Sequence, residues 1–197
     1  MAPKAKPASA PKAKAKAAAA SQAPAAWPPK VPMGPIEDVL PMIEANDEDI
    51  DMLMLRSLEA GMDAEGTFGP KEIEYVCECL QKNSMLTHLN ASFNPVGDSG
   101  VEHIAKLLSN GGAKGLMRLE LNCCGVGSAG AIALAEVLTD NKTMQVVELM
   151  NNSIDDEGGK ALLEMLKKNR KLKQLQVSLN QISAELQAQI DKQLLIR

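Results

Sequence analysis

The residues with the clearest chemical potential are three glycines, Gly125, Gly127 and Gly130, which form a G-x-G-x-x-G pattern. They follow an apolar stretch, open a helical pattern and stand 18 residues before Glu148. Glycines in this arrangement let the backbone approach a dinucleotide pyrophosphate at a helix N-terminus. The same positions recur in frame in the segments PVGDSG and SIDDEG, which fit no nucleotide. We therefore interpret the glycines as turn positions and expect no cofactor.

Residues 97–100, Gly-Asp-Ser-Gly, have the letters of a serine-nucleophile segment. A Ser–His–Asp triad needs a general base and an orienting acid in a folded barrel, and the chain has only two histidines, His88 and His103. In the frame of the neighbouring segments, this tetrapeptide lies at a strand-to-helix turn. We expect Asp98 or Ser99 to cap the helix that follows.

Asp47, Asp49 and Asp51 begin a D-x-D-x-D series like that of a calcium loop. A calcium loop of this kind also needs glycine at its sixth position and a bidentate glutamate at its twelfth, where this chain has Met52 and Leu58. We interpret the series as a solvated turn and expect no metal site there.

The four cysteines form two local pairs without the spacing of a metal site. Cys77 and Cys79 diverge because they are two positions apart in a helical pattern, and Cys123 and Cys124 alternate at a strand end. Cys77 takes a core position, whereas Cys79 and Cys123 are predicted to be accessible. We expect reduced, structural thiols in a cytoplasmic protein that has no membrane span, with a cytoskeletal or nuclear location as alternatives.

These motifs belong to a larger repeating unit. An apolar L-x-x-L-x-L stretch, an Asn-type turn, a glycine and an amphipathic helix recur from residue 86 onward. The turn residues Asn94, Cys124, Asn152 and Asn180 are 30, 28 and 28 positions apart. A fixed period in the range of roughly 20–50 residues predicts a solenoid, in which each strand–helix unit buries its apolar face against the next.

The repeat frame extends upstream and predicts one domain over residues 36–197 with about five strand–helix units. Helical patterns end on asparagine at Asn46, Asn83, Asn110, Asn141 and Asn169. Pro41 interrupts the first helical pattern, as expected for a terminal repeat, and residues 58–69 read as a longer loop. Apolar residues at every fourth position from Ile182 to Leu194 predict a closing helix.

The units resemble leucine-rich repeats of the ribonuclease-inhibitor-like class. The matching positions of one copy are Leu116, Leu119, Leu121, Cys124, Val126, Gly130, Leu134 and Leu138. In the next copy they are Met144, Val147, Leu149, Asn152, Ile154, Gly158, Leu162 and Leu166. The resemblance implies a short, curved, right-handed α/β solenoid with parallel strands on the concave side and helices on the convex side.

Residues 1–35 differ in composition, because they are Ala, Lys and Pro with little else. Mutual repulsion of the lysines and the missing donors of proline predict a disordered basic tail. The lysines expected to contact a polyanion are Lys4, Lys6, Lys12, Lys14 and Lys16. Nucleic acid or the acidic tail of tubulin would suit this segment, with nonspecific and steeply salt-dependent binding. A solubilising or targeting leader is an equal alternative.

Charge is unevenly distributed within an overall net charge of −4. Residues 37–80 hold thirteen acids against two bases, and residues 81–197 are nearly balanced. Five cations gather at one helix end and the loop after it, namely Lys167, Lys168, Arg170, Lys171 and Lys173. Cations stabilise a helix C-terminus in any case, and as a surface this cluster would suit an acidic partner.

The candidate partner-binding surface consists of strand side chains that alternate with the core leucines. They form three rows: Met52, His88, Arg118, Val146 and Gln174; Met54, Asn90, Glu120, Glu148 and Gln176; and Arg56, Ser92, Asn122, Met150 and Ser178. Phe93 lies beside them on the rim. We predict that these mixed, unobstructed rows bind another protein. Five strands at about 4.8 Å make a face only about 20 Å wide, so loops, the tail or a larger assembly must add area.

The sequence therefore favours a non-enzymatic protein-binding adaptor or scaffold. Similar repeats occur in NOD-like receptors, in Ran GTPase-activating proteins and in tropomodulin, so a regulator of a small GTPase and a cytoskeletal cap are alternatives. The third alternative is a protein that binds polyanions mainly through its N-terminal tail. The chain offers no residue that carries over as the functional site of those families.

Overall fold

A computed structural model of the chain describes residues 36–55 and 67–196. The expected tail, with its polyanion-contacting lysines, lies outside the described residues, and so do Arg56 and most of the long loop. Helices and strands alternate in the order α1 (Ile36–Glu44), β1 (Met52–Met54), α2 (Pro70–Cys79), the 3-10 turn η1 (Leu80–Lys82), β2 (His88–Asn90), α3 (Gly97–Ser109), β3 (Arg118–Glu120), α4 (Ser128–Asp140), β4 (Val146–Glu148), α5 (Asp156–Lys168), β5 (Gln174–Gln176) and α6 (Ala184–Leu195).

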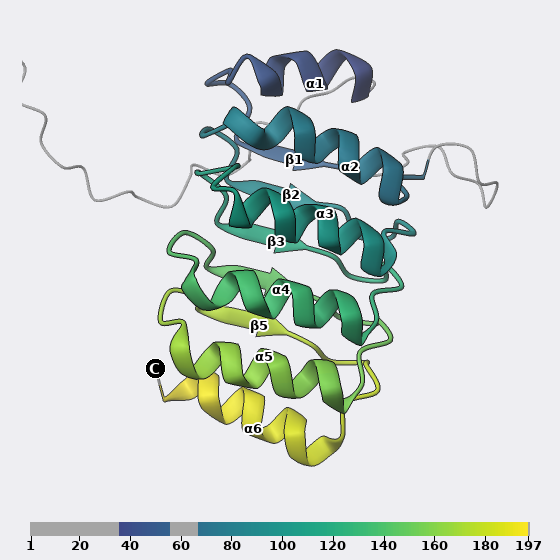
Figure 1. The fold of residues 1–197 in the computed structure, drawn as a ribbon, viewed down its shortest axis with the longest axis vertical. Coiled ribbons are helices and arrows are strands. Elements are labelled where there is room, and N and C mark those ends of the chain that lie inside the picture. The colour runs from purple at the N-terminus through teal and green to yellow at the C-terminus, as the bar shows by residue number, and fades with distance from the viewer. Residues whose placement is uncertain (1–35, 56–66, 197) are drawn as a thin grey trace, which may run out of the picture.

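The five strands form one parallel sheet in the order in which they occur along the chain. Their central residues lie in register, namely Leu53, Leu89, Leu119, Val147 and Leu175. The helices stack beside one another in a single layer that covers one face of this sheet (Figure 1). The predicted α/β solenoid is thereby confirmed. The other face, turned away from the helices, is called the sheet face below, and it corresponds to the predicted concave side.

The core is aliphatic and continuous from the first unit to the last. In the unit of β3 and α4, the buried positions include Leu116, Leu119, Leu121, Leu134 and Leu138, each with no exposed surface. Each helix packs against the next one in sequence, so the apolar side of one unit is covered by its neighbours. The closing helix α6 buries Leu186 and Ile190 in the same core.

Asparagines join successive turns, as predicted. The Nδ2 atom of Asn152 donates to the carbonyl oxygens of Leu121 at 2.8 Å and Leu149 at 3.0 Å, and its Oδ1 accepts from the backbone N–H groups of Cys124 and Val126. Cys124 takes the equivalent position one unit earlier, where its Sγ donates to the Ala91 carbonyl oxygen at 3.2 Å. These bonds pair buried backbone N–H and carbonyl groups that no hydrogen bond of the sheet pairs.

A second set of asparagines joins the helix ends. Asn83 Nδ2 donates to the Ile43 carbonyl oxygen at 2.7 Å, and Asn169 Nδ2 donates to the Leu138 carbonyl oxygen at 2.5 Å. Both asparagines are buried. Each asparagine, at the end of its own helix, donates to a carbonyl group near the C-terminus of a helix in the preceding unit. These bonds pair carbonyl groups that otherwise lack a partner at a helix C-terminus.

Candidate functional site

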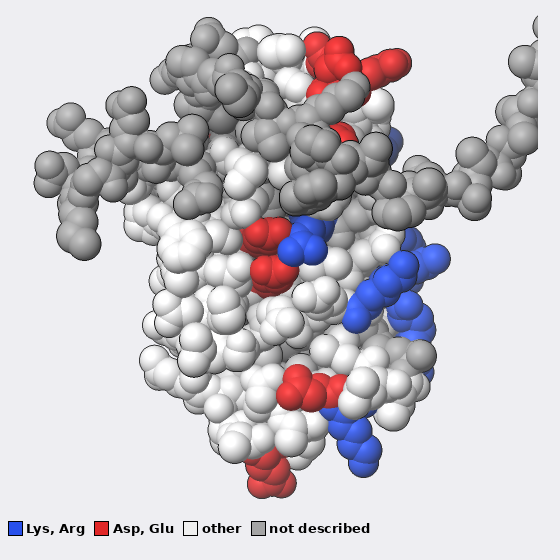
Figure 2. Space-filling model, turned by 180° about the vertical axis from the view of Figure 1, so that it is seen from behind, with Lys and Arg blue, Asp and Glu red and all other residues white. Residues whose placement is uncertain are grey.

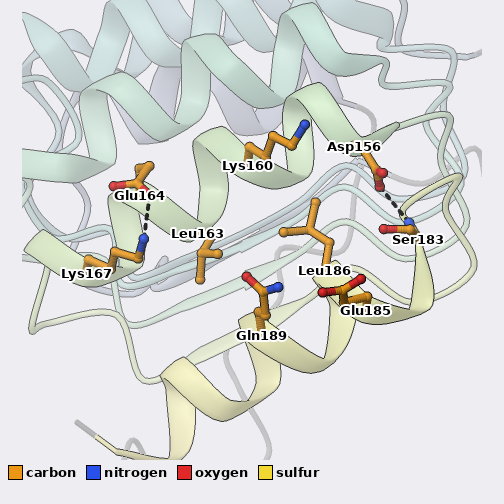
Figure 3. Close-up of a pocket in the computed structure, with 9 residues that line it drawn as sticks. All are labelled: Asp156, Lys160, Leu163, Glu164, Lys167, Ser183, Glu185, Leu186 and Gln189. Atoms are coloured by element: carbon orange, nitrogen blue, oxygen red, sulfur yellow. Dashed lines mark hydrogen bonds and ion pairs between the residues drawn. The ribbon is translucent and has the colours of Figure 1, made fainter.

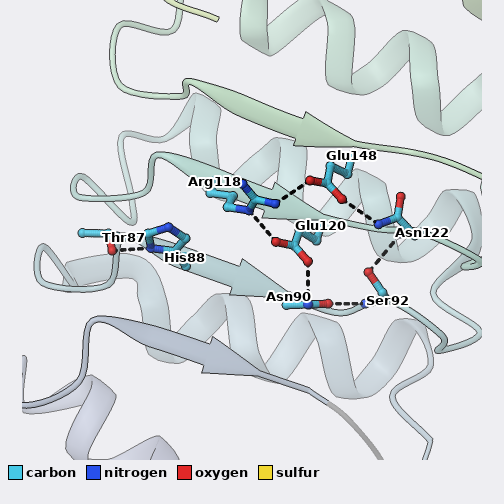
Figure 4. A network of polar contacts seen from close by, with 8 residues as sticks. All are labelled: Thr87, His88, Asn90, Ser92, Arg118, Glu120, Asn122 and Glu148. Carbon is cyan, nitrogen blue, oxygen red and sulfur yellow. Dashed lines mark hydrogen bonds and ion pairs between the residues drawn. The ribbon is translucent and has the colours of Figure 1, made fainter. Parts of the chain in front are cut away.

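A polar network lies at the centre of the sheet face, around Arg118 on β3 (Figures 2 and 4). The Arg118 guanidinium donates from Nε to Glu120 Oε1 and from Nη2 to Glu148 Oε1, the second at 2.5 Å. The side chains of Arg118, Glu120 and Glu148 are 32%, 19% and 17% exposed. One guanidinium thus serves two half-buried carboxylates, and the three groups carry a net charge of −1 at neutral pH.

Two amides complete the bonding of these carboxylates. Asn90 Nδ2 donates to Glu120 Oε2 at 2.6 Å, and Asn122 Nδ2 donates to Glu148 Oε2 at 2.9 Å. The network therefore spans β2, β3 and β4 and fixes its side chains in one geometry (Figure 4). The sequence placed these residues in neighbouring rows, but their pairing depends on side-chain conformations that the row pattern does not specify.

His88 extends the network toward the first strand. Its Nδ1 lies 2.6 Å from the Thr87 hydroxyl, which donates to the Asp51 carbonyl oxygen. Burial lowers the pKa of the imidazole, and the nearby Arg118 guanidinium lowers it further, against the opposing charges of Asp51 and Glu120. His88 is therefore held neutral at physiological pH, and it can donate or accept a hydrogen bond. Thr87 belongs to this site although the sequence did not single it out, and Asp51, which the sequence marked only as part of an acidic turn, contributes its backbone carbonyl group.

The predicted rows differ in exposure. Half-buried positions are Met52, Met54, His88, Asn90, Arg118, Glu120, Val146 and Glu148. Exposed positions are Met150, Gln174, Gln176 and Ser178. The expectation of an unobstructed third row is wrong for Ser92 and Asn122, which are 4% and 8% exposed. Their polar atoms bond one another instead, since Ser92 Oγ accepts from the Asn122 backbone N–H at 3.1 Å.

A row of left-handed residues forms the rim next to the sheet face. Phe93, Cys123, Asn151 and Leu179 occupy the same position in four units and have φ angles of 64°, 57°, 55° and 58°. The Phe93 and Leu179 side chains are 69% and 71% exposed. A bulky side chain with positive φ is uncommon and costs free energy. The fold therefore holds two apolar side chains on the surface in a conformation that it imposes on the whole row.

The glycine-rich loop binds an anion, and that anion belongs to the chain itself. Asp98 Oδ1 accepts from the backbone N–H groups of Gly127 at 2.6 Å and Gly130 at 2.9 Å, at the N-terminus of α4. Gly125 has φ 68°, as the predicted turn requires. A Cβ on Gly130 would lie 2.7 Å from Asp98 Oδ1. The position that a pyrophosphate would need is thus filled by a carboxylate of the preceding unit.

The expectation that Asp98 or Ser99 caps its own helix is therefore wrong. The N-cap residue of α3 is Val96, which makes no side-chain capping hydrogen bond, and among the described residues Asp98 Oδ1 accepts from α4 instead. The carboxylate of Asp98 points across to α4 because α3 and α4 are neighbours in the stack. The sequence pattern suggests a cap for the helix that follows in the chain, but it does not show which helix packs alongside.

The cysteines are mostly buried. Cys77 lies in the core as predicted, but Cys79 is only 3% exposed, so the prediction that it is accessible is wrong. Burial raises the pKa of the Cys77 thiol to about 12 and, together with the neighbouring Glu44, that of Cys79 to about 11. Cys123 is partly exposed. Among the described residues, no group of three or more His, Cys, Asp and Glu side chains is placed to hold a metal ion.

A groove of about 370 Å³ lies on the helical side, between α5 and α6 (Figure 3). Asp156, Lys160, Leu163, Glu164, Lys167, Ser183, Glu185, Leu186 and Gln189 line it. Asp156 Oδ1 accepts from the Ser183 backbone N–H at 2.6 Å, and Lys167 Nζ lies 2.5 Å from Glu164 Oε1. The groove contains none of the predicted partner-binding residues. In the part of the chain that the structure describes, no helix has the length and apolar character of a membrane span.

Comparison with known sequences identifies the repeats. A family profile described as Leucine Rich repeat matches residues 82–105, 115–135, 140–163 and 168–185. Ribonuclease inhibitor of Mus musculus is 32% identical over 121 residues, which are 58% of this chain and 26% of that protein. NACHT, LRR and PYD domains-containing protein 4E of Mus musculus is 35% identical over 86 residues, 44% of this chain and 9% of that protein. The chain thus spans about a quarter or less of these relatives.

Solved structures share the fold at low sequence identity. Leiomodin-1 actin-binding site 2 superposes with a TM-score of 0.68 at 16% identity, covering 83% of this chain and 89% of that one. The tropomodulin C-terminal domain of Caenorhabditis elegans gives a TM-score of 0.65 at 11% identity, covering 82% and 92%. The repeated motif, the parallel sheet and these comparisons agree: the chain belongs to the leucine-rich-repeat proteins, in the ribonuclease-inhibitor-like class.

Proposed function

We propose that this chain is a non-enzymatic protein-binding module, an adaptor or scaffold whose partner docks on the sheet face. Leucine-rich repeats are typically a protein-binding fold. The observation that carries the proposal is the network of Arg118, Glu120 and Glu148, whose side chains are already held in one geometry. Binding to side chains that are already ordered costs less conformational entropy than binding that must order them.

The charged, apolar and amide side chains of the sheet face indicate which chemical groups a partner would present to it. The centre carries one excess negative charge on half-buried carboxylates, so it favours a partner that presents a lysine or arginine there. Met52 and Met54 on β1 give an adaptable apolar contact on one side of this centre. Gln174 and Gln176 on β5 give exposed amides on the other side.

The rim supplies the area that the strands lack. Three residues from each of five strands are fewer than the 20–30 residues that a standard interface uses on each side, roughly 800 Å² per partner. Phe93, Met150 and Leu179 are exposed beside the strand ends. Phenylalanine and methionine are among the residues enriched at protein interfaces, so Phe93 and Met150 suit this role. A partner that covers both the strands and this rim would bury enough surface for a stable complex.

Site-specific photo-crosslinking tests the proposal. The photoreactive residue p-benzoyl-phenylalanine is placed at Val146 on the sheet face or, as a matched control, at Glu136 on the exposed surface of α4. We expect a partner protein to crosslink to the residue at Val146 and not to the residue at Glu136. Once that partner is purified, we expect it to bind the Gln174→Arg variant less tightly than the unchanged chain. Equal crosslinking from both positions, or crosslinking from Glu136 alone, would contradict the sheet face as the docking surface.

Two relatives suggest purified probes for this experiment. By name, the leiomodin-1 fragment is an actin-binding site, and the mouse relative is an inhibitor of ribonuclease. Actin and a ribonuclease are therefore the first proteins to titrate. Two further functions stay predictions and need assays of their own. One is regulation of a small GTPase, and the other is polyanion binding through Lys4, Lys6, Lys12, Lys14 and Lys16.

A further inference from the structure

Cations gather along the edge of the molecule where helices end and strands begin. This basic edge consists of Lys114, Lys142, Arg170, Lys171 and Lys173, all with exposed side chains. Figure 2 shows basic side chains grouped along one side of the sheet face, apart from the central network. The edge is a second charged surface, separate from the residues proposed above to bind a partner.

Three of these cations repeat with the fold. Lys114, Lys142 and Arg170 stand two residues before Leu116, Met144 and Leu172, the buried residues that begin the apolar stretch of three successive units. Neighbouring strands are about 4.8 Å apart and packed helices about 8–10 Å, so loops between them recur at intermediate spacing. An extended peptide presents every second side chain on one face, about 7 Å apart. The spacing of alternate side chains in such a peptide therefore lies between the strand and helix spacings.

Helix stabilisation does not account for the whole edge. The dipole of a helix acts within its last turn, yet Lys114 lies five residues beyond the end of α3 and Lys173 five residues beyond the end of α5. None of the five cations forms an ion pair with another described residue. Asp140 is an acid on this edge, at the end of α4. The first turns of α3, α5 and α6, at the opposite edge, hold Asp98, Asp156, Glu157 and Glu185.

The chemistry of the edge favours carboxylates over nucleic acid. Binding of single-stranded nucleic acid commonly combines a basic groove with aromatic side chains on which the bases stack. The described aromatic residues, Phe68, Tyr75 and Phe93, belong to other parts of the fold, so bases have no stacking platform here.

We propose that the basic edge binds an extended acidic segment of a protein, with Asp or Glu at alternate positions facing Lys114, Lys142 and Arg170. This surface would act beside the sheet face, so that one partner covers both or two partners bind together. Binding through several exposed charges is expected to weaken steeply as salt rises.

The test uses the full chain and a fluorescein-labelled peptide with six Glu–Ser repeats, followed by fluorescence anisotropy at low and physiological salt. One variant combines Lys114→Glu, Lys142→Glu and Arg170→Glu. The matched control combines Lys71→Glu and Lys160→Glu with Ser99→Glu and Ala129→Glu, which change the net charge by the same amount at exposed positions in the N-terminal halves of the helices, away from the edge. Circular dichroism and thermal unfolding confirm that both variants fold.

We expect the edge variant to bind the peptide at least about tenfold more weakly than the control variant, since three charge contacts are reversed at once. Equal weakening in both variants would overturn the proposal, because net charge alone would then explain binding. Loss of binding only on changing the five tail lysines to alanine would overturn it too. Tighter binding of an oligothymidylate of equal charge would replace the acidic peptide by nucleic acid.

Discussion

The carboxylate of Asp98 lies on the N-terminus of the neighbouring helix α4, where its Oδ1 accepts the backbone N–H of Gly130 at 2.9 Å. The two residues belong to successive units. Similar bonds continue along the same edge, because Ser128 Oγ donates to Asp155 Oδ1 at 2.5 Å, and Asp156 accepts from Ser183. Each helix N-terminus from α4 to α6 therefore receives a polar contact from the unit before it, which couples the stability of neighbouring units.

Removal of this cross-unit cap tests the coupling. We expect Asp98→Ala to lower the free energy of unfolding by about 1–2 kcal/mol, the usual cost of losing a helix cap. Gly130→Ala should destabilise the protein as well, because the new Cβ would lie 2.7 Å from Asp98 Oδ1 and 3.2 Å from its Cα. Urea unfolding measures both. The control is Ser99→Ala at the exposed neighbouring position, and equal effects of Asp98→Ala and Ser99→Ala would contradict the assignment.

Cys124 interrupts the row of turn asparagines, and restoring the row should stabilise the fold. We expect Cys124→Asn to raise the free energy of unfolding by about 0.5–1.5 kcal/mol, since an amide donates more strongly than a thiol to the Ala91 carbonyl oxygen. The reverse change, Asn152→Cys, should lower stability by at least as much, because four hydrogen bonds of that amide would be lost or weakened. Thermal unfolding of the pair decides, and a destabilising Cys124→Asn would show that the site is shaped for sulfur.

Arg118 compensates two carboxylates, so its removal should cost more than the removal of either partner. We expect Arg118→Met to destabilise the protein by about 1–3 kcal/mol, because Glu120 and Glu148 then lose a charged donor while half-buried. Glu148→Gln should cost less. A double-mutant cycle over Arg118 and Glu148, read by urea unfolding, should give a coupling free energy above about 0.5 kcal/mol. Additive effects would mean that the pair is not coupled.

His88 makes stability depend on pH in a definite direction. Its pKa is lowered in the folded state, so the unfolded chain binds the extra proton first as the pH falls through the ordinary value of 6.5. Stability should therefore decrease between pH 7.5 and pH 5.5. In His88→Gln this part of the decrease should disappear. Thermal unfolding at both pH values compares the two proteins, and identical slopes would rule out His88 as the titrating group.

The thiols should react unequally. Cys77, Cys79 and Cys124 are buried, and burial raises their pKa values to about 12, about 11 and about 11. Cys123 is partly exposed on the rim. We expect Ellman's reagent at pH 8 to modify about one thiol in the native protein and all four in guanidinium chloride. In Cys123→Ser the rapid native reaction should vanish, and its persistence would place the accessible thiol elsewhere.

The repeat pattern was sufficient to predict the fold because each unit repeats the same short-range solution. Leucines at fixed spacing predict buried strands, and the periodic apolar residues of Ala184–Leu195 predict the closing helix. The turn role of Asn94, Asn152 and Asn180 follows from the same frame. Such features depend on residues within one unit and on an identical neighbour, both of which are visible in a single sequence.

The errors came from contacts between units. Asp98 caps α4 and not α3, and Cys79 is covered by the first unit, near Glu44. Ser92 and Asn122 were predicted to be open, but the short strands leave them at a turn where neighbouring units close over them. These outcomes depend on the rotation and side-chain conformations of adjacent units, and a linear frame does not contain that information.

The parallel register of the strands has a consequence for how this surface could change over time. A duplicated unit inserted between β3 and β4 would enter the ladder without rebuilding the core, since every interface in the stack is of one kind. It would, however, move Glu148 one strand away from Arg118 and break their ion pair. Gain or loss of units would therefore preserve the architecture and reset recognition in a single genetic step.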